Sequence, residues 1–343
     1  MSFDQEMIER CLALAEKGRG LASPNPMVGS VVTYNKKIIG EGFHQKFGGP
    51  HAEVNAINSV KDKGLLKEAT VYVNLEPCAH FGKTPPCADL LVNSGVKRVV
   101  IGCIDSFSEV SGKGIEKIKK AGIDITVGVL EKKCLDFNKR FFLFHREKRP
   151  FIILKWAESK DGLLSPANQE KGKPLWMTGE ESKTLVHRWR TEEDAIMVGT
   201  NTAIMDNPSL TARLWKGRNP LRIVIDRELK IPKEANLLDG LAKTLVFTEK
   251  EKGPEENVDF VKVSSIKLKD LLTELYKRGV QSLIVEGGKR LLESFINEGV
   301  WDEARVFVAP MSLNAGVKAP SLGEENLSQR VIGADTLSIY KRS

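Results

Sequence analysis

The 343-residue sequence lacks several features that would assign it at once to a special class of protein. Its five cysteines are an odd number without the dense spacing of a small disulfide-bonded fold, so we expect reduced thiols. No apolar run approaches the length of a membrane span. The N-terminal segment carries Asp4, Glu6 and Glu9 in an amphipathic pattern, which is untypical of a signal peptide. We therefore expect a cytoplasmic protein without a membrane partner.

A basic tract is also missing, although the sequence has 52 Lys and Arg against 45 Asp and Glu, a formal net charge of +7. The charges alternate in sign, as in the Glu-Lys-Glu-Lys run at 249–252. Interspersed charges are typical of a solvated surface, whereas a nucleic-acid interface gathers basic residues on one face. We therefore predict no nucleic-acid partner, and the positive excess favours phosphorylated ligands.

The length suits two domains, and 41% hydrophobic residues allow each half to bury a core. A charged run that ends in proline, at 147–150, marks the expected boundary and gives domains 1–147 and 148–343. Strand-like and helix-like patterns alternate in both halves, which favours α/β folds and predicts a three-layer first domain.

The expected elements follow from these patterns. In the first half they are helices at 4–17, 88–93, 115–120 and 131–145, and strands at 28–34, 38–43, 70–75, 96–103 and 123–129. In the second half they are strands at 151–154, 195–198, 221–225, 244–247, 282–285 and 305–308, and helices at 179–189, 268–277 and 290–297.

One stretch of the first half carries the residues of a catalytic zinc site. His51-Ala52-Glu53 is followed by Pro77-Cys78 and, after eight intervening residues, by Cys87. One imidazole and two thiolates leave the fourth position of zinc to water, whose pKa falls to about 7. The order matches the zinc-deaminase signature, in which the Glu moves protons and is no ligand, although the second Cys comes later than in C-x-x-C. This pattern predicts hydrolytic deamination.

Local structure supports the same site. His51 and Glu53 should lie in the first turn of a helix, because apolar residues at helical spacing follow them. Pro77 fits the first turn of another helix, which would point Cys78 at the metal. Two helix starts beside the strand at 70–75 would then converge on one ion.

Other interpretations of these residues exist. Taken singly, Cys78 and Cys87 are more typical of buried small side chains, and His51 of a surface residue. A structural zinc would need a fourth protein ligand, for which His80 is the nearby candidate. The combination of all these residues favours the catalytic interpretation.

Beyond this stretch, the sequence resembles the bifunctional deaminase/reductase family of bacterial riboflavin biosynthesis over essentially its whole length. The motifs that carry the resemblance lie at 24–29 (PNPMVG), 40–44 (GEGFH), 50–54 (PHAEV), 75–78 (LEPC), 82–87 (GKTPPC), 154–157 (LKWA), 161–162 (DG), 176–179 (WMTG), 206–213 (DNPSLTAR) and 285–288 (VEGG). The TPPC segment is highly specific, whereas the EGG element alone would be weak.

The resemblance implies a cytidine-deaminase-like domain followed by a domain similar to dihydrofolate reductase. It implies two reactions on a phosphorylated pyrimidine: hydrolysis of the exocyclic amine of a diaminopyrimidinone that carries a phosphoribosylamino group, then NADPH-dependent reduction of the ribosyl unit to ribityl. The implied cofactors are one zinc ion per chain and NADPH. Assembly into a homo-oligomer stays open.

The resemblance also implies roles for individual residues. His51, Cys78 and Cys87 match the zinc ligands, and Glu53 matches the proton shuttle. Substrate positions fall on Asn25, His44, Lys83, Thr84, Lys155, Arg190, Leu210, Arg213 and Glu286. Cofactor positions fall on Ala157, Trp176, Thr202, Asp206, Gly288, Lys289, Arg290 and Leu291. Without the resemblance, Asn25 reads as a turn residue, each Arg as a surface residue and Trp176 as core.

Two departures from the family pattern affect expected substrate contacts. Phe107 stands where the family has a polar Asp-Pro-Asn-Pro element, and could stack on the pyrimidine. Pro174 replaces a serine expected at the substrate phosphate.

The cofactor site does not follow the Rossmann pattern, because no G-x-G-x-x-G follows a strand. A Gly-Gly pair instead follows the strand at 282–285, and a helix begins near Lys289. Backbone N–H groups at such a helix start can bind a pyrophosphate.

Two rival functions remain at this stage. The chain could be a single-function zinc nucleoside or tRNA deaminase with a non-catalytic second domain. It could also be a zinc-stabilised nucleic-acid-binding protein, which would require salt-sensitive binding that the interspersed charges do not favour.

Overall fold

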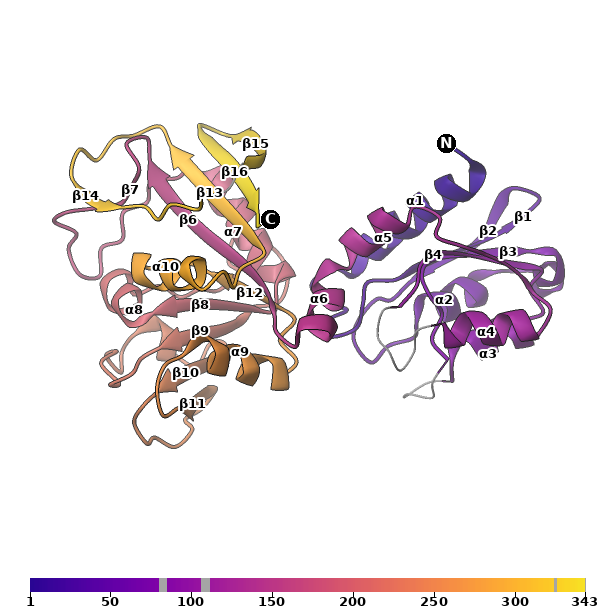
Figure 1. The fold of residues 1–343 in the computed structure, drawn as a ribbon, viewed down its shortest axis with the longest axis horizontal. Coiled ribbons are helices and arrows are strands. Elements are labelled where there is room, and N and C mark those ends of the chain that lie inside the picture. The colour runs from indigo at the N-terminus through magenta and orange to yellow at the C-terminus, as the bar shows by residue number, and fades with distance from the viewer. Residues whose placement is uncertain (80–84, 106–111, 324–325, 343) are drawn as a thin grey trace. The chain divides into compact units, whose positions relative to one another are not determined.

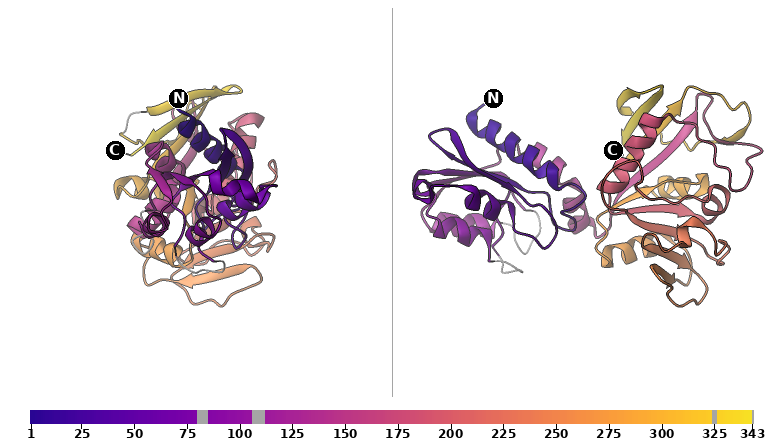
Figure 2. Two further views of the ribbon diagram at one scale, coloured as in Figure 1. Left: turned by 90° about the vertical axis from the view of Figure 1, so that its right-hand side faces the viewer. Right: turned by 180° about the vertical axis from the view of Figure 1, so that it is seen from behind.

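The computed structural model describes residues 1–79, 85–105, 112–323 and 326–342, and the chain divides into two compact units, Met1–Lys148 and Arg149–Ser343. Lys83, Thr84, His80 and Phe107 lie outside the described residues. None of the described helices combines the length and the apolar character that crossing a membrane requires. Each unit is an α/β fold with helices on both faces of its main sheet (Figures 1 and 2).

The described part of the first unit contains a five-stranded sheet in the order β2-β1-β3-β4-β5. Strand β1 is antiparallel to both β2 and β3, and β3, β4 and β5 are parallel. The strands are β1 (Gly29–Tyr34), β2 (Lys37–Phe43), β3 (Thr70–Leu75), β4 (Arg98–Cys103) and β5 (Asp124–Val127). The helices are α1 (Phe3–Ala15), α2 (Ala52–Ser59), α3 (Cys87–Asn93), α4 (Lys113–Lys120), α5 (Glu131–Phe137) and α6 (Lys139–Glu147).

Alternating strand residues build one core on each face of this sheet. Val31, Tyr72 and Val100 pack with residues of α1, α5 and α6. Their neighbours along the strands, such as Val32 and Val71, pack with residues of α2, α3 and α4. The first unit therefore has the three layers that the sequence predicts, with α1 and α5 on one face and α2 to α4 on the other (Figure 1).

The second unit is built on a larger sheet in the order β11-β10-β9-β8-β12-β6-β13-β16-β15. Its strands are parallel from β11 to β13, and the last two pairs are antiparallel. The strands are β6 (Phe151–Ser159), β8 (Ala195–Gly199), β9 (Leu221–Ile225), β10 (Thr244–Thr248), β11 (Val258–Lys262), β12 (Ser282–Val285), β13 (Glu303–Ala309), β15 (Asn326–Ile332) and β16 (Asp335–Lys341), with a separate pair β7 (Leu163–Pro166) and β14 (Gly316–Lys318). The helices are α7 (Glu180–Glu192), α8 (Thr200–Asp206), α9 (Leu268–Lys277) and α10 (Lys289–Asn297).

The two faces of this sheet have different partners. Leu154 and Trp156 of β6 belong to the core that includes α9 and α10. Because side chains alternate along a strand, Lys155 points to the opposite face. There the Trp189 ring of α7 lies against Phe307 of β13, with ring centroids 5.6 Å apart. Lys155 therefore lies on the face of the sheet that α7 covers.

Two helix predictions were wrong, and both concern residues near the first site. The expected helix at 131–145 is two helices, α5 and α6, separated at Asn138. No helix starts at Pro77, because the Cys78 carbonyl instead accepts the Ala88 N–H at 3.1 Å. The helix near this point starts at Cys87. The sequence patterns also failed to indicate one helix and five strands, several of them short or polar: α8, β7, β11, β14, β15 and β16.

Candidate active sites

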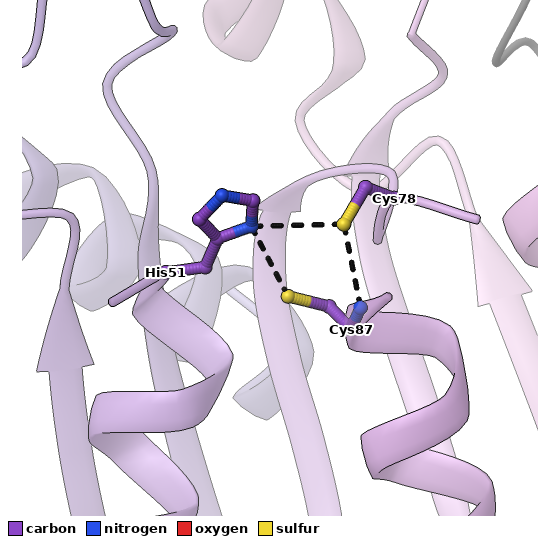
Figure 3. Close-up of side chains that lie close together, drawn as sticks. All are labelled: His51, Cys78 and Cys87. Carbon is purple, nitrogen blue, oxygen red and sulfur yellow. Dashed lines mark hydrogen bonds between the residues drawn. The ribbon is translucent and has the colours of Figure 1, made fainter. Parts of the chain in front are cut away.

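The first site lies where α2 and α3 begin beside the end of β3. His51 is the N-cap of α2 and Cys87 is the first residue of α3, whereas Cys78 follows β3 outside any helix or strand. His51 Nδ1 lies 3.6 Å from Cys78 Sγ and 3.3 Å from Cys87 Sγ (Figure 3). The three potential ligand atoms all lie within 4.8 Å of one another. This arrangement of soft donors fits a tetrahedral zinc ion with one position left open.

The protonation of the two thiols also fits a metal site. A hydrogen bond from Cys87 is the main cause that lowers the pKa of Cys78 to about 4, and His51 lowers it further. The Cys87 N–H also donates to Cys78 Sγ at 3.3 Å. The same thiol pairing raises the pKa of Cys87. The lowered pKa favours the thiolate form of Cys78, and thiolate is the form that binds a metal.

Glu53 completes this site from the first turn of α2. Its side chain is buried, with 3% of the residue surface exposed. Burial raises the pKa of Glu53 to about 7, and the Cys78 charge adds to this increase. A carboxyl group with a pKa near neutrality can both accept and donate a proton, as the predicted shuttle must.

Asn25 and His44 lie together beside the zinc-ligand set. The His44 ring is 5.5 Å from the His51 ring, centroid to centroid. His44 Nδ1 lies 3.0 Å from the Pro50 carbonyl, which can only accept, so this nitrogen carries the hydrogen. His44 Nε2 then accepts from the Asn25 amide at 3.0 Å. Burial lowers the pKa of His44, which is consistent with this neutral form.

Glu76, which the sequence analysis did not single out, organises the neighbouring loop. It is buried, and its carboxylate accepts hydrogen bonds from the backbone N–H groups of Asp105, Gly112, Gly114 and Ile115. Its position in the Leu-Glu-Pro-Cys motif, two residues before the proposed zinc ligand Cys78, could have indicated this role from the sequence. Glu76 therefore holds the start of α4 against the end of β3.

The second site is a charged cluster on the α7 face of the second sheet. Val285 of β12 pairs with Leu154 of β6, so the next residues, Glu286 and Lys155, are neighbours on parallel strands. Arg190 of α7 donates from Nη2 to Glu286 Oε2 at 3.0 Å. Burial alone would raise the pKa of Glu286, but the charges of Arg190 and Lys155 lower it below its usual range. Burial lowers the pKa of Lys155, although Glu286 opposes this.

The segment after α8 closes one side of the charged cluster. Arg190 Nη1 donates to the Thr211 carbonyl at 3.1 Å, and Arg213 Nη1 donates to the Thr211 hydroxyl at 2.9 Å. Leu210 is 2% exposed and has a left-handed backbone with φ of 53°. Leu210 is therefore a buried residue at the edge of this cluster.

His187 is a member of this cluster that the sequence analysis missed. It lies three residues before Arg190 on α7, and its Nδ1 accepts the Arg213 backbone N–H at 2.9 Å. Burial and the charges of Arg190 and Arg213 lower the pKa of His187 to about 4. Because residues three apart lie on the same side of a helix, its spacing from Arg190 could have indicated this position from the sequence.

Two polar atoms of the cluster are unsatisfied. Within the described part of the chain, Arg190 Nε and Glu286 Oε1 are buried without a hydrogen-bond partner. Unsatisfied buried groups are rare in proteins and are common where a ligand completes the site. A polar substrate can supply the missing partners.

The expected cofactor residues gather at the carboxyl ends of β8 and β12, which are neighbouring parallel strands. A Cβ atom at Gly288 would lie 3.0 Å from Thr202 Oγ1, so the two helix starts of α8 and α10 approach closely there. The first intrahelical bonds of α10 run from Leu291 and Leu292 to the Gly288 carbonyl. The N–H groups of Lys289 and Arg290 precede them, which fits a pyrophosphate.

The remaining expected cofactor positions are more dispersed. Asp206 accepts a hydrogen bond from the Gln169 amide at 2.5 Å, and burial raises its pKa. Trp176 is 63% exposed, with the Lys183 ammonium 5.0 Å from its ring centroid, so it is not a core residue. Ala157 pairs with Phe307 on β13.

Both halves of the chain match known protein families. Residues 1–103 match the family model of the cytidine and deoxycytidylate deaminase zinc-binding region, and residues 150–339 match that of the RibD C-terminal domain. The riboflavin biosynthesis protein RibD of Aquifex aeolicus is 41% identical, with 99% of each chain covered. The chain belongs to the RibD family.

Solved structures of the family have the same fold. The diaminohydroxyphosphoribosylaminopyrimidine deaminase/5-amino-6-(5-phosphoribosylamino)uracil reductase of Thermotoga maritima superposes with a TM-score of 0.91 at 35% identity, and 99% of each chain is covered. RibD of Acinetobacter baumannii superposes with a TM-score of 0.92 at 32% identity, again over 99% of each chain. The cytidine-deaminase-like first domain and the dihydrofolate-reductase-like second domain are thereby confirmed.

Membership of the RibD family makes this chain a bifunctional enzyme of riboflavin biosynthesis, with a deaminase and a reductase activity. Its deaminase part is zinc-dependent and its reductase part uses NADPH. The rival single-function deaminase is not favoured, because the second half matches the reductase part of the family.

Proposed function

We propose that residues 1–147 deaminate a diaminopyrimidinone that carries a phosphoribosylamino group, and that residues 148–343 reduce the ribosyl unit of the product to ribityl. The convergence of His51, Cys78 and Cys87 beside the buried Glu53 is the observation that supports the first activity. The name of the Thermotoga maritima relative supports the choice of substrate.

In the deaminase site, His51, Cys78 and Cys87 would hold zinc, which when bound activates water for attack on the pyrimidine carbon. Glu53 takes a proton from the water and returns protons to the ring nitrogen and to the departing amine. The C–N bond breaks, a carbonyl forms and ammonia leaves. We propose that Asn25 and His44, which lie beside His51, contact the substrate together with Lys83 and Thr84.

In the reductase site, NADPH when bound supplies a hydride to the sugar carbon. We propose that Gly288 to Leu291 bind the cofactor pyrophosphate, with Ala157, Trp176, Thr202 and Asp206 along the rest of the cofactor.

The charged cluster would bind the sugar phosphate portion of the substrate. Both terminal nitrogens of Arg190 already donate hydrogen bonds within the protein, to the Thr211 carbonyl and to Glu286. Its proposed role is therefore to orient Glu286 toward the substrate. Exposed Arg213 presents a guanidinium that suits a phosphate, and the Leu210 backbone lies beside it. Lys155, whose pKa is lowered by burial, is suited to donate a proton as the hydride arrives.

The same proposal makes a small phosphorylated pyrimidine the partner of this enzyme, without nucleic acid or membrane, and places the enzyme in the cytoplasm. It leaves homo-oligomer formation open.

Replacing Glu53 by Gln tests the proposal directly. We expect the variant to keep zinc and to lose ammonia release, because the amide cannot shuttle a proton. NADPH oxidation with the deaminated intermediate should be unchanged. Ammonia release at the normal rate would show that Glu53 is not the shuttle, and failure of the parent enzyme to consume NADPH would contradict the second activity.

A further inference from the structure

The segment from Pro24 to Gly29 carries Asn25 to the deaminase site. Only its last residue, Gly29, belongs to strand β1. The ladder hydrogen bonds of the sheet therefore do not fix the residues before it. The Val28 carbonyl accepts the His44 N–H at 2.9 Å, and the Asn25 N–H donates to the Ala22 carbonyl at 2.9 Å. Between these two bonds, the conformation of Pro26 and Met27 must be set by other contacts.

Asn138 provides the first of these contacts. It is 3% exposed and lies between α5 and α6, 111 residues from Met27 in the sequence. Its Oδ1 accepts the Met27 N–H at 2.9 Å, and its Nδ2 donates to the Met27 carbonyl at 3.0 Å. One carboxamide thus satisfies both backbone polar groups of a residue two positions from Asn25.

Two further contacts hold the same segment. Asn74 of β3 is fully buried, donates to the Met27 carbonyl at 3.1 Å and accepts the Gly29 N–H at 2.8 Å. A Cβ atom at Gly29 would lie 2.0 Å from the Cys11 carbonyl, so the segment is pressed against α1. The segment is held from β3, from α1 and from the α5–α6 junction.

We propose that Asn138 is a positioning residue for deamination: through Met27 it fixes the segment that presents Asn25 to His44 and to the pyrimidine. The inference rests on the proposed function, because it requires Asn25 to contact the substrate. It also explains the break between α5 and α6, since an asparagine side chain bonded to Met27 sits where the helix is interrupted.

Asn138 is a better probe of this role than Asn74. Asn74 lies on β3, four residues before Cys78, so its replacement would also disturb a proposed zinc ligand. Asn138 belongs to the opposite layer of the unit. Its loss leaves the Met27 N–H without its acceptor and leaves the His51, Cys78 and Cys87 side chains untouched.

The test compares Asn138→Ala, Asn25→Ala and the double variant in the zinc-loaded full-length enzyme. We expect Asn138→Ala to raise KM for the pyrimidine on the order of tenfold, the effect of losing about one well-formed hydrogen bond. Zinc content and NADPH oxidation with the deaminated intermediate should not change. In the Asn25→Ala background, Asn138→Ala should have no further effect on KM, because interacting residues are not additive.

Cys134→Ala is the matched control. Cys134 is fully buried one turn earlier on α5, so its truncation weakens the same helix without touching Met27. We expect its KM to equal that of the parent enzyme. Asn138→Ser serves where the alanine variant does not fold, and should give a smaller KM increase because its hydroxyl can keep one bond.

Three outcomes overturn the inference. Equal KM values for Asn138→Ala and Cys134→Ala would show that Asn138 is only structural. Additive effects in the double variant would show that it does not act through Asn25. An unaffected KM in Asn25→Ala alone would remove both the inference and the assignment of Asn25, whereas absent ammonia release in the parent enzyme would remove the proposed function itself.

Discussion

The two sites are constructed differently. The proposed zinc ligands come from one stretch, His51 to Cys87. One imidazole and two thiols are a ligand set typical of zinc, so the residue types alone indicate which metal the site binds. The reductase cluster draws on β6, α7, the segment after α8 and β12, and its charges are already partly paired with one another. Ligand chemistry defines the first site, and strand register defines the second.

The difference extends to what a substitution should do. In the deaminase site, His51 and Cys78 are only half-buried, so either side chain can be lost with little effect on the fold. In the reductase site, Arg190 and Glu286 form a buried ion pair and are also proposed to act on the substrate, so we expect function and stability to be coupled there.

The largest expected effect concerns metal binding. Cys78→Ala should remove bound zinc and lower ammonia release by more than about 100-fold, since even residues that only orient metal ligands contribute 10–100-fold. NADPH oxidation by the same preparation should be normal. Metal analysis and the two assays check this, and parallel loss of both activities would contradict the independence of the two sites.

The next effect is on the stability of the second unit. Arg190→Ala leaves the buried Glu286 carboxylate without its hydrogen-bonded ion-pair partner, although the charge of Lys155 remains nearby, and this should destabilise the unit by about 3 kcal/mol. All five tryptophans lie between 156 and 301, so tryptophan fluorescence during urea unfolding reports this unit alone.

Arg188→Ala is the control on the same helix. Arg188 forms an i,i+4 pair with Glu192 and is 43% exposed. Its loss should change stability by no more than about 0.5 kcal/mol. Equal destabilisation by the two variants would show that the buried pair has no special contribution.

A smaller effect depends on pH. His187 has a pKa of about 4 in the fold against an ordinary value of 6.5, so it stays neutral while the unfolded chain takes up a proton. Its contribution to stability is complete above pH 6.5 and is lost as pH falls toward 4, by about 2–3 kcal/mol. His187→Gln should flatten this loss in the tryptophan-detected unfolding. An unchanged pH profile would contradict the assignment.

The smallest effect is expected at helix α1 of the first unit. Asp4 accepts two hydrogen bonds from Arg98 and one from the Tyr72 hydroxyl. Burial opposes ionisation of Asp4, but Arg98 and Tyr72 lower its pKa below 3.8, so the stabilisation is present above that pH and is lost below it. Asp4→Asn should cost about 1 kcal/mol at neutral pH. Zinc release during urea unfolding follows this unit, and the tryptophan signal should not move.

Most of the helices and strands could be predicted from the sequence, because the spacing of apolar residues and the positions of turn residues depend only on neighbouring residues. The strand at 70–75 and the helix at 268–277 have the predicted limits. The errors at Pro77 and Asn138 arise where a distant partner decides the local conformation. The Cys78 carbonyl bonds to α3, and the Asn138 side chain bonds to Met27, and neither partner is visible in the local pattern.

The sequence by itself determined the α/β class of both halves and the zinc chemistry, because residue type and order limit which ions and elements can form. Only the tertiary structure decided which partners the polar side chains find. It placed His187 beside Arg213, paired Arg190 with Glu286 and brought Asn138 to Met27. These contacts join residues up to 111 positions apart, and the register of strands and the packing of helices set them.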